Sequence, residues 1–104
     1  MSVESEVLWL DEQREVSLRE LLEMSGLREA ELLELVHSGA IPANDQPGAG
    51  YRFSARVITV ARTACRLRDD FELDTRGVAV ALRLLERVRA LEEEIGRLRA
   101  ELPR

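Results

Sequence analysis

The chain of 104 residues is long enough for one domain with a modest core, and 45% of it is hydrophobic, with one Trp, one Tyr and two Phe. A core of leucine, valine and alanine is typical of helical packing, so we expect a mostly α fold. The net charge is −5, and a single cysteine and a single histidine exclude an internal disulfide, a multi-histidine metal site and a CxxC zinc site.

The sequence carries no pattern of catalysis or cofactor binding. The glycines at Gly48 and Gly50 lack the spacing of a phosphate-binding loop, so we expect no catalytic residues, no cofactor and no metal. No apolar run approaches the roughly 18 residues of a membrane span. The acidic start of the chain is unlike the basic start of a secretory signal. We therefore expect a cytoplasmic protein that does not enter a membrane.

The first third of the chain is acidic and indicates two short helices. Before them, the apolar run Val7–Leu10 fits a short strand or an extended arm. Ser17 and Glu20 have the spacing of a capping box, so a helix is expected to begin there and to end at Gly26, which tolerates a positive φ. A second helix is expected to begin near Arg28.

The second helix, which ends at Ser38 and Gly39, has an apolar side and an acidic side. At 100° per residue, its inner positions are Leu32, Leu35 and Val36. Its outer positions are Glu31, Glu34, His37 and Ser38. Two short helices joined by a glycine turn make a helix-turn-helix motif.

A turn-rich segment and a strand follow the motif. Residues 43–50 are rich in turn-forming residues, and alternation places Tyr51 and Phe53 on one side of an extended strand, with Arg52 on the other. We expect this segment to form the wing of a winged helix-turn-helix. A connecting helix is then expected from about residue 54 to residue 70.

The C-terminal helix, capped by Asp74, has apolar residues at alternating spacings of three and four. This seam consists of Ala81, Leu84, Val88, Leu91, Ile95, Leu98 and Leu102. We expect it to pair two copies of the chain, and the main dimerisation residues to be Leu84, Val88, Leu91, Ile95 and Leu98. The alternative is that the seam packs on the chain's own domain. Opposite charges at Arg87 and Glu92, and at Glu94 and Arg99, favour a parallel pair.

These elements predict a single domain over residues 1–104. Residues 16–53 hold the helix-turn-helix and wing, residues 54–73 the connecting helix, and residues 74–102 the C-terminal helix. The expected fold is a mostly α, winged helix-turn-helix with a long, coiled-coil-like C-terminal helix.

The charge of the motif argues against DNA binding. Residues 17–38 contain five glutamates and two arginines, whereas a DNA-reading helix gains affinity from Lys and Arg side chains that displace counterions. An acidic protruding face fits a basic protein partner, although solubility alone also explains exposed glutamates. The expected partner contacts are Glu31, Glu34 and His37, with Asp69 and Asp70 as further candidates.

One stretch of the chain is basic. It holds Arg52, Arg56, Arg62, Arg66 and Arg68, with no acid between the first and the last. On a helix, Arg56, Arg62 and Arg66 share one arc and Arg68 lies outside it. This stripe either contacts phosphate or pairs with carboxylates of the acidic first third, and we favour pairing within the chain.

The segment from residue 66 to residue 82 resembles a known family. It contains Arg66-Leu67-Arg68, Phe71, Leu73-Asp74 and Gly77-Val78-Ala79-Val80-Ala81-Leu82. This pattern closely resembles the chaperone-modulator proteins of the CbpM type, small bacterial relatives of MerR helix-turn-helix regulators. The resemblance extends from about Val16 to Leu102. It implies a MerR-like fold and a MerR-type dimer with antiparallel helices, so the orientation of the pair stays open.

The resemblance also implies a function. Proteins of this type bind the J-domain of a DnaJ-like co-chaperone of the CbpA type, prevent it from stimulating its Hsp70 partner DnaK, and restrain its DNA binding. J-domains present a basic helix, so the resemblance and the acidic face indicate the same partner. The alternatives are a MerR-like transcription regulator that uses the arginines on DNA and a coiled-coil adaptor with another partner.

Overall fold

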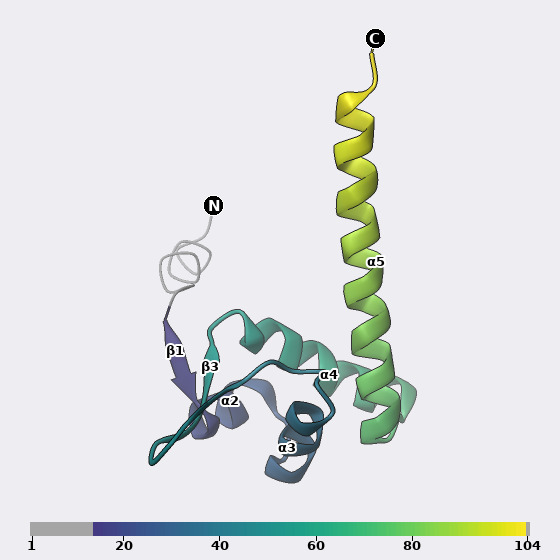
Figure 1. Cartoon of the computed structure of the whole chain (residues 1–104). Coiled ribbons are helices and arrows are strands. Elements are labelled where there is room, and N and C mark those ends of the chain that lie inside the picture. The colour runs from purple at the N-terminus through teal and green to yellow at the C-terminus, as the bar shows by residue number, and fades with distance from the viewer. Residues whose placement is uncertain (1–13, 104) are drawn as a thin grey trace, which may run out of the picture.

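Four helices and a three-stranded antiparallel sheet make up residues 14–103, the part of the chain that the computed structural model describes (Figure 1). In chain order these elements are β1 (Glu15–Ser17), α2 (Leu18–Ser25), α3 (Glu29–His37), β2 (Asn44–Gln46), β3 (Gly50–Ser54), α4 (Val57–Phe71) and α5 (Thr75–Glu101). The expected mostly α, winged helix-turn-helix fold with a long C-terminal helix is confirmed. The arm expected at residues 7–10 lies outside the described residues.

Side-chain caps fix the starts of two helices where the sequence predicts them. At the start of α2, the Ser17 hydroxyl accepts from the Glu20 amide at 3.1 Å, and the Glu20 carboxylate accepts from the Ser17 amide at 3.0 Å. At the start of α5, the Asp74 carboxylate accepts from the Gly77 amide at 2.8 Å. These bonds satisfy backbone donors that have no partner inside the helix, so each cap defines the first residue of its helix.

The turn between α2 and α3 depends on Gly26. Its φ of +83° is in the left-handed region, and its amide donates to the Leu22 carbonyl at 3.2 Å. A Cβ atom at this position would lie 3.2 Å from the Cys65 sulfur of α4. Glycine therefore permits both the turn and the close approach of this turn to α4.

The sheet has the order β1-β3-β2, with Val16 opposite Phe53 and Asp45 opposite Tyr51. Residues 44–46, expected within a turn, form a strand because their backbone pairs with β3. The connecting helix begins at Val57 rather than at residue 54, because Ser54 still pairs with Glu15 in the sheet.

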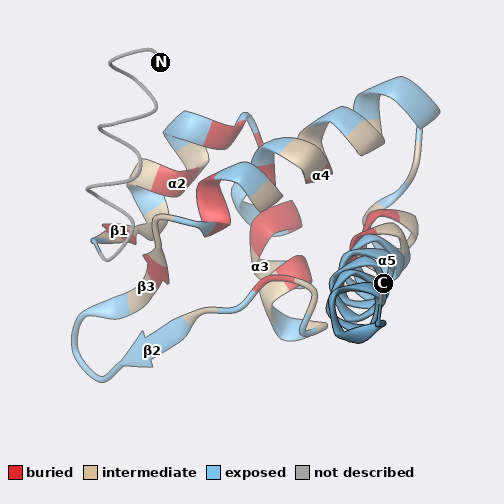
Figure 2. Ribbon diagram, turned by 90° about the horizontal axis from the view of Figure 1, so that it is seen from above, coloured by how far each residue is buried: buried red, intermediate tan, exposed pale blue. Residues whose placement is uncertain are grey.

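The core lies where α2, α3, β3, α4 and the base of α5 meet, and Figure 2 shows buried residues gathered on the inner sides of these elements. Among residues 14–103, Phe53 is the largest fully buried side chain. The other buried apolar residues are Val16, Leu21, Leu27, Leu32, Leu35, Ile41, Val57, Ile58, Ala61, Ala64, Val78 and Leu82. Aliphatic residues thus form most of this core, as the composition predicts.

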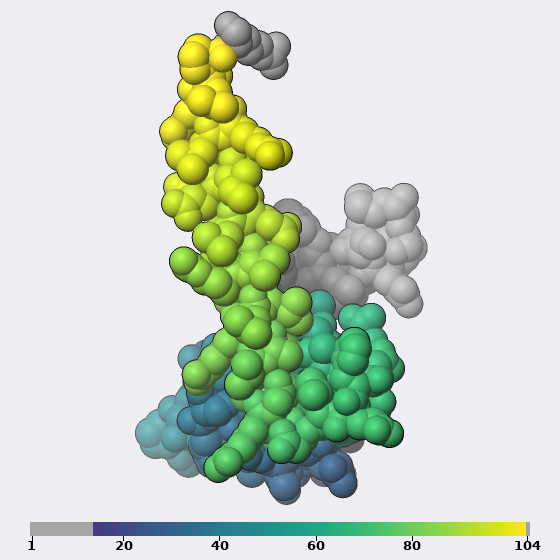
Figure 3. Space-filling model, turned by 90° about the vertical axis from the view of Figure 1, so that its right-hand side faces the viewer, coloured from purple at the N-terminus to yellow at the C-terminus, as the bar shows by residue number. Residues whose placement is uncertain are grey.

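Among the described residues, the long helix α5 contacts the body at its base. Val78 and Leu82 are buried there, and the Arg83 guanidinium donates to the Ser38 carbonyl at the end of α3. Beyond this point α5 extends away from the body (Figures 1 and 3). The seam side chains from Leu84 to Leu102 are 40–67% exposed. The alternative that this seam packs on the chain's own domain is therefore wrong.

Two glycine substitutions test the role of backbone geometry. Gly26→Ala should destabilise the fold by more than about 1 kcal/mol, because alanine is strained at a positive φ and its Cβ meets Cys65. Gly96→Ala, in the exposed part of α5, should be neutral or stabilising by up to about 1 kcal/mol, because a Cβ there contacts nothing within 4 Å. Urea unfolding of both variants measures the difference, and equal effects would contradict this description of the turn.

Candidate partner interface

Helix α3 begins without a hydroxyl cap. Arg28 occupies the N-cap position, and its side chain has no oxygen that can accept a backbone hydrogen bond. Glu31, three residues later, turns back instead, and its carboxylate accepts from the Arg28 amide at 2.9 Å and from the Arg28 guanidinium at 3.2 Å. This capping interaction directs the Glu31 side chain toward the start of the helix and the neighbouring α4.

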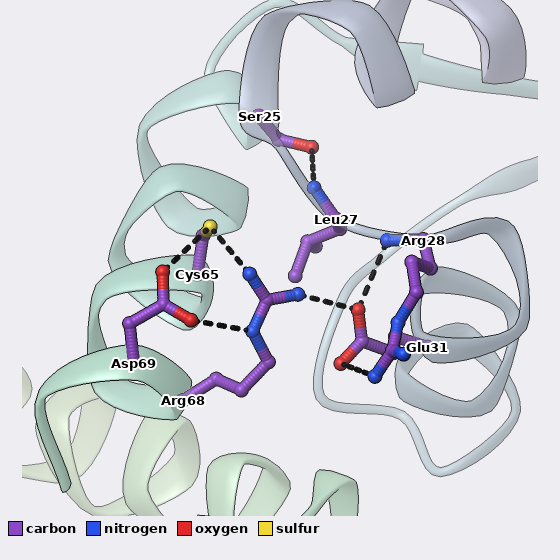
Figure 4. A network of polar contacts seen from close by, with 7 residues as sticks. All are labelled: Ser25, Leu27, Arg28, Glu31, Cys65, Arg68 and Asp69. Atoms are coloured by element: carbon purple, nitrogen blue, oxygen red, sulfur yellow. Dashed lines mark hydrogen bonds and ion pairs between the residues drawn. The ribbon is translucent and has the colours of Figure 1, made fainter. Parts of the chain in front are cut away.

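The Glu31 carboxylate also binds an arginine of α4, and Figure 4 shows this network of polar contacts. Arg68 donates to Glu31 at 2.6 Å and to Asp69 at 2.9 Å, and its third nitrogen donates to the Cys65 sulfur at 3.2 Å. The Arg68 side chain is largely buried, at 22% exposure. A paired and largely buried guanidinium with three acceptors joins α3 to α4 at a fixed position.

The network shifts the pKa values of the Glu31 carboxyl and the Arg68 guanidinium. Burial alone raises the pKa of the Glu31 carboxyl, but hydrogen bonds from Arg28 and Arg68 outweigh it and lower this pKa to about 2. The hydrogen bond to Asp69 raises the pKa of the Arg68 guanidinium, burial lowers it, and the bond to Glu31 raises it further. Both charges are therefore fixed at neutral pH.

The prediction that Glu31 lies on the outer side of its helix is wrong. Only 9% of the residue is exposed, and its carboxylate is occupied by Arg28 and Arg68. A helical wheel at 100° per residue misplaces Glu31 because it takes no account of helix capping. The signal was present in the sequence: Glu31 stands at the third position of the helix, where a glutamate turns back to the N-cap.

The outward side of α3 carries the remaining acidic residues. We call the set Glu29, Ala30, Leu33, Glu34 and His37 the acidic face. Leu33 is half-buried and the other four are exposed. The helix itself, Glu29–His37, contains three glutamates and no Lys or Arg. Two carboxylates, Glu29 and Glu34, therefore remain on the surface of the helix that a DNA-binding relative would insert into a groove.

The wing extends this face at its C-terminal end. The Tyr51 hydroxyl lies 3.3 Å from the His37 Nε2 atom, and the two rings meet edge to face. Asp45 of β2 pairs with Tyr51 across the hairpin, and paired side chains lie on the same side of a sheet. Sequence reasoning missed Tyr51 and Asp45 because no local pattern reports a contact between the wing and α3.

The other two predicted contact residues lie elsewhere. Asp69 is on α4 and binds Arg68 near the first turn of α3, whereas His37 is at the last turn of α3. Asp70 follows Asp69 and is exposed. The structure thus brings Glu34 and His37 onto one face and leaves Asp69 and Asp70 beyond the opposite end of the helix.

Pairing within the chain is confirmed for one arginine of the basic stretch. Arg68 binds Glu31 of the acidic first third, as expected, and it also binds Asp69 on its own helix. Arg62 donates instead to a backbone carbonyl, that of Met24, at 3.0 Å. The basic stretch is therefore divided between an internal ion-pair network and the surface.

Comparison with known proteins agrees with this geometry. Residues 16–100 match the MerR HTH family regulatory proteins. The chain is 40% identical over 80 residues to the chaperone modulatory protein CbpM of Salmonella arizonae, covering 77% of this chain and 79% of the relative. It is 41% identical over 70 residues to CbpM of Salmonella paratyphi B, covering 67% of this chain and 69% of the relative.

These matches and the winged helix-turn-helix place the chain in the MerR helix-turn-helix regulatory family and, within it, among proteins of the CbpM type. The curated relatives are named as chaperone modulators, so chaperone modulation is the role that this likeness supports. In residues 14–103, every helix is too short or too polar to cross a membrane.

The Glu31 network predicts a dependence of stability on pH. The folded-state pKa of about 2 is below the ordinary value of 4.5, so the interaction stabilises the fold above pH 4.5 and is lost as the pH falls toward 2. The shift corresponds to about 3 kcal/mol. Glu31→Gln should lower the free energy of unfolding by about this amount at pH 7 and have a much smaller effect near pH 2.

Urea unfolding between pH 7 and pH 2.5 measures this difference. The exposed neighbour provides the control, since Glu29→Gln changes the same charge outside the network. Equal losses for wild type and Glu31→Gln as the pH falls would show that the ion pair does not stabilise the fold.

Proposed function

We propose that this protein binds the J-domain of a DnaJ-like co-chaperone through the acidic face of α3 and thereby prevents that co-chaperone from stimulating its Hsp70 partner. The observation that carries the proposal is the charge of α3, which has exposed glutamates and no Lys or Arg where a DNA-reading helix needs cations. The likeness to chaperone modulatory proteins supports the same partner class.

The chemistry of the face fits a cationic helix. Glu29 and Glu34 offer exposed carboxylates, and Asp45 of the wing adds a third. The rings of His37 and Tyr51 offer apolar surface to a partner, next to these carboxylates. Complementary charge accelerates association and excludes partners of the wrong sign, while the apolar centre of a contact supplies binding energy.

We also propose that the protein acts as a homodimer joined along α5. The exposed apolar seam extends over about 30 Å of helix and includes Leu84, Val88, Leu91, Ile95 and Leu98. An apolar stripe of this length on a protein surface indicates a protein partner, and the repeat fits a second copy of the same helix. Because the seam is distinct from the acidic face, each copy keeps its own partner site.

A DNA-binding regulator is the second candidate, because residues 16–100 match regulatory proteins of the MerR family. It would place the wing and the arginines of the basic stretch on phosphate. A gel shift separates the two candidates, since operator binding shows sequence preference and a steep dependence on salt.

Charge reversal on the acidic face tests the first proposal. Glu34→Arg combined with Asp45→Arg should weaken J-domain binding about tenfold, mainly through the association rate, and should reduce its dependence on salt. Surface plasmon resonance with the purified J-domain at low and high salt measures both effects. Glu93→Arg on α5, a single charge reversal away from the acidic face, is the control and should bind normally. If both variants bind as wild type does, the acidic face is not the contact.

A charge in the seam tests the dimer. Leu91→Asp should convert the dimer to a folded monomer, because a carboxylate would be buried between the two apolar faces. Ala90→Asp, one residue away and outside the seam, is the control and should stay dimeric. Sedimentation equilibrium measures the mass, and circular dichroism the helix content. A monomeric wild type, or a dimeric Leu91→Asp variant, would contradict the proposed interface.

A further inference from the structure

The basic stretch forms a surface feature that the proposed function does not use. An open hollow of about 500 Å³ lies where the C-terminal end of α2 meets α4, two helices that run side by side in Figure 2. Its lining residues are Met24, Ser25, Thr59, Arg62, Cys65 and Arg66. Two are arginines and none is acidic, although acids outnumber bases in the whole chain by 20 to 15.

Both arginines have N–H groups that can donate to a ligand. Arg62 uses its Nε–H on the Met24 carbonyl at 3.0 Å, which holds the side chain over the hollow and leaves its terminal nitrogens to other acceptors. Arg66 lies one turn further along α4 and is exposed, and its side chain makes no hydrogen bond or ion pair with any residue in 14–103. Thr59 lies three residues before Arg62 on the same side of the helix.

The hollow also has an apolar wall. Met24 is 44% exposed at its rim, and a flexible thioether adapts to side chains of different shape. Guanidinium groups bind carboxylates through paired hydrogen bonds. The lining therefore combines two positions for a carboxylate with one for an aliphatic side chain.

We propose that this hollow binds a short acidic segment of a protein partner, with carboxylates on Arg62 and Arg66 and an aliphatic side chain on Met24. The charge around the hollow favours a short segment over a nucleic acid. Asp70, which is exposed, follows Arg66 by one turn of α4. Its carboxylate would repel a long polyanion that continues beyond the two arginines.

The charge of this hollow is opposite in sign to that of the acidic face, and the proposal for the hollow does not rest on the proposed function. The protein would then bind a cationic helix with α3 and an anionic segment with α2 and α4. A peptide-binding assay without a J-domain tests the hollow alone, so its result is independent of whether the acidic face binds a J-domain.

The experiment uses a fluorescein-labelled peptide of glutamates around a single leucine. Fluorescence anisotropy measures binding to the full chain, and ¹H–¹⁵N spectra locate it through the Nε–H signals of Arg62 and Arg66. Arg66→Gln removes no hydrogen bond within residues 14–103, so the fold should be kept and binding should weaken about tenfold. Arg97→Gln on α5 is the control and should bind as wild type does.

Three outcomes would overturn the proposal. The first is unchanged peptide binding by Arg66→Gln. The second is an equal response of the same Nε–H signals to inorganic phosphate, which would reveal a general anion site. The third is tighter binding of duplex DNA than of the peptide at physiological salt, which would make the hollow a nucleic-acid surface.

Discussion

The bond between Glu31 and Arg68 determines which charges of the helix-turn-helix face the solvent. Arg68 reaches from α4 to the first turn of α3 and holds the Glu31 carboxylate inside the body. At the other end of α3, Arg83 of α5 donates to the Ser38 carbonyl. Two arginines from two other helices thus fix both ends of a nine-residue helix, in addition to its buried leucines.

Whether such an ion pair stabilises the fold, as well as fixing the position of α3, depends on its geometry. Removing two charges from water is costly, and the energy of the pair only offsets that cost when the geometry is good and further hydrogen bonds are made. Here the carboxylate has two arginines and a backbone amide, so the requirement is met. The consequence for function is that Glu29 and Glu34 remain as the outward charges, on a helix with a fixed orientation.

The surface of the protein is divided by charge. The acidic face of α3 continues to Asp45 of the wing, Arg62 and Arg66 border a separate hollow, and the seam of α5 is apolar. In a helix-turn-helix protein that binds DNA, the second helix of the motif lies in the DNA groove. Under the proposed function, the acidic charge of one helix favours a polypeptide partner over a nucleic acid within the same fold.

Much of this fold follows from local patterns. The Ser17 and Asp74 caps, the left-handed turn at Gly26 and the apolar seam of α5 depend on residues within a few positions of each other, and all lie where the sequence predicts them. The candidate site is different. Glu31 pairs with a residue 37 positions away, and Tyr51 meets His37 across 14 positions. Periodicity contains no information about such contacts. A helical wheel therefore placed Glu31 on the outer side of its helix, and no sequence pattern included Tyr51 and Asp45 in the site.

The most direct test is the ATPase rate of an Hsp70 chaperone stimulated by the J-domain of a DnaJ-like co-chaperone, measured as this protein is added. We predict that the rate falls to that of the unstimulated chaperone once the J-domain is saturated. A rate that stays fully stimulated, from a protein that binds a defined DNA duplex at physiological salt, would contradict the account.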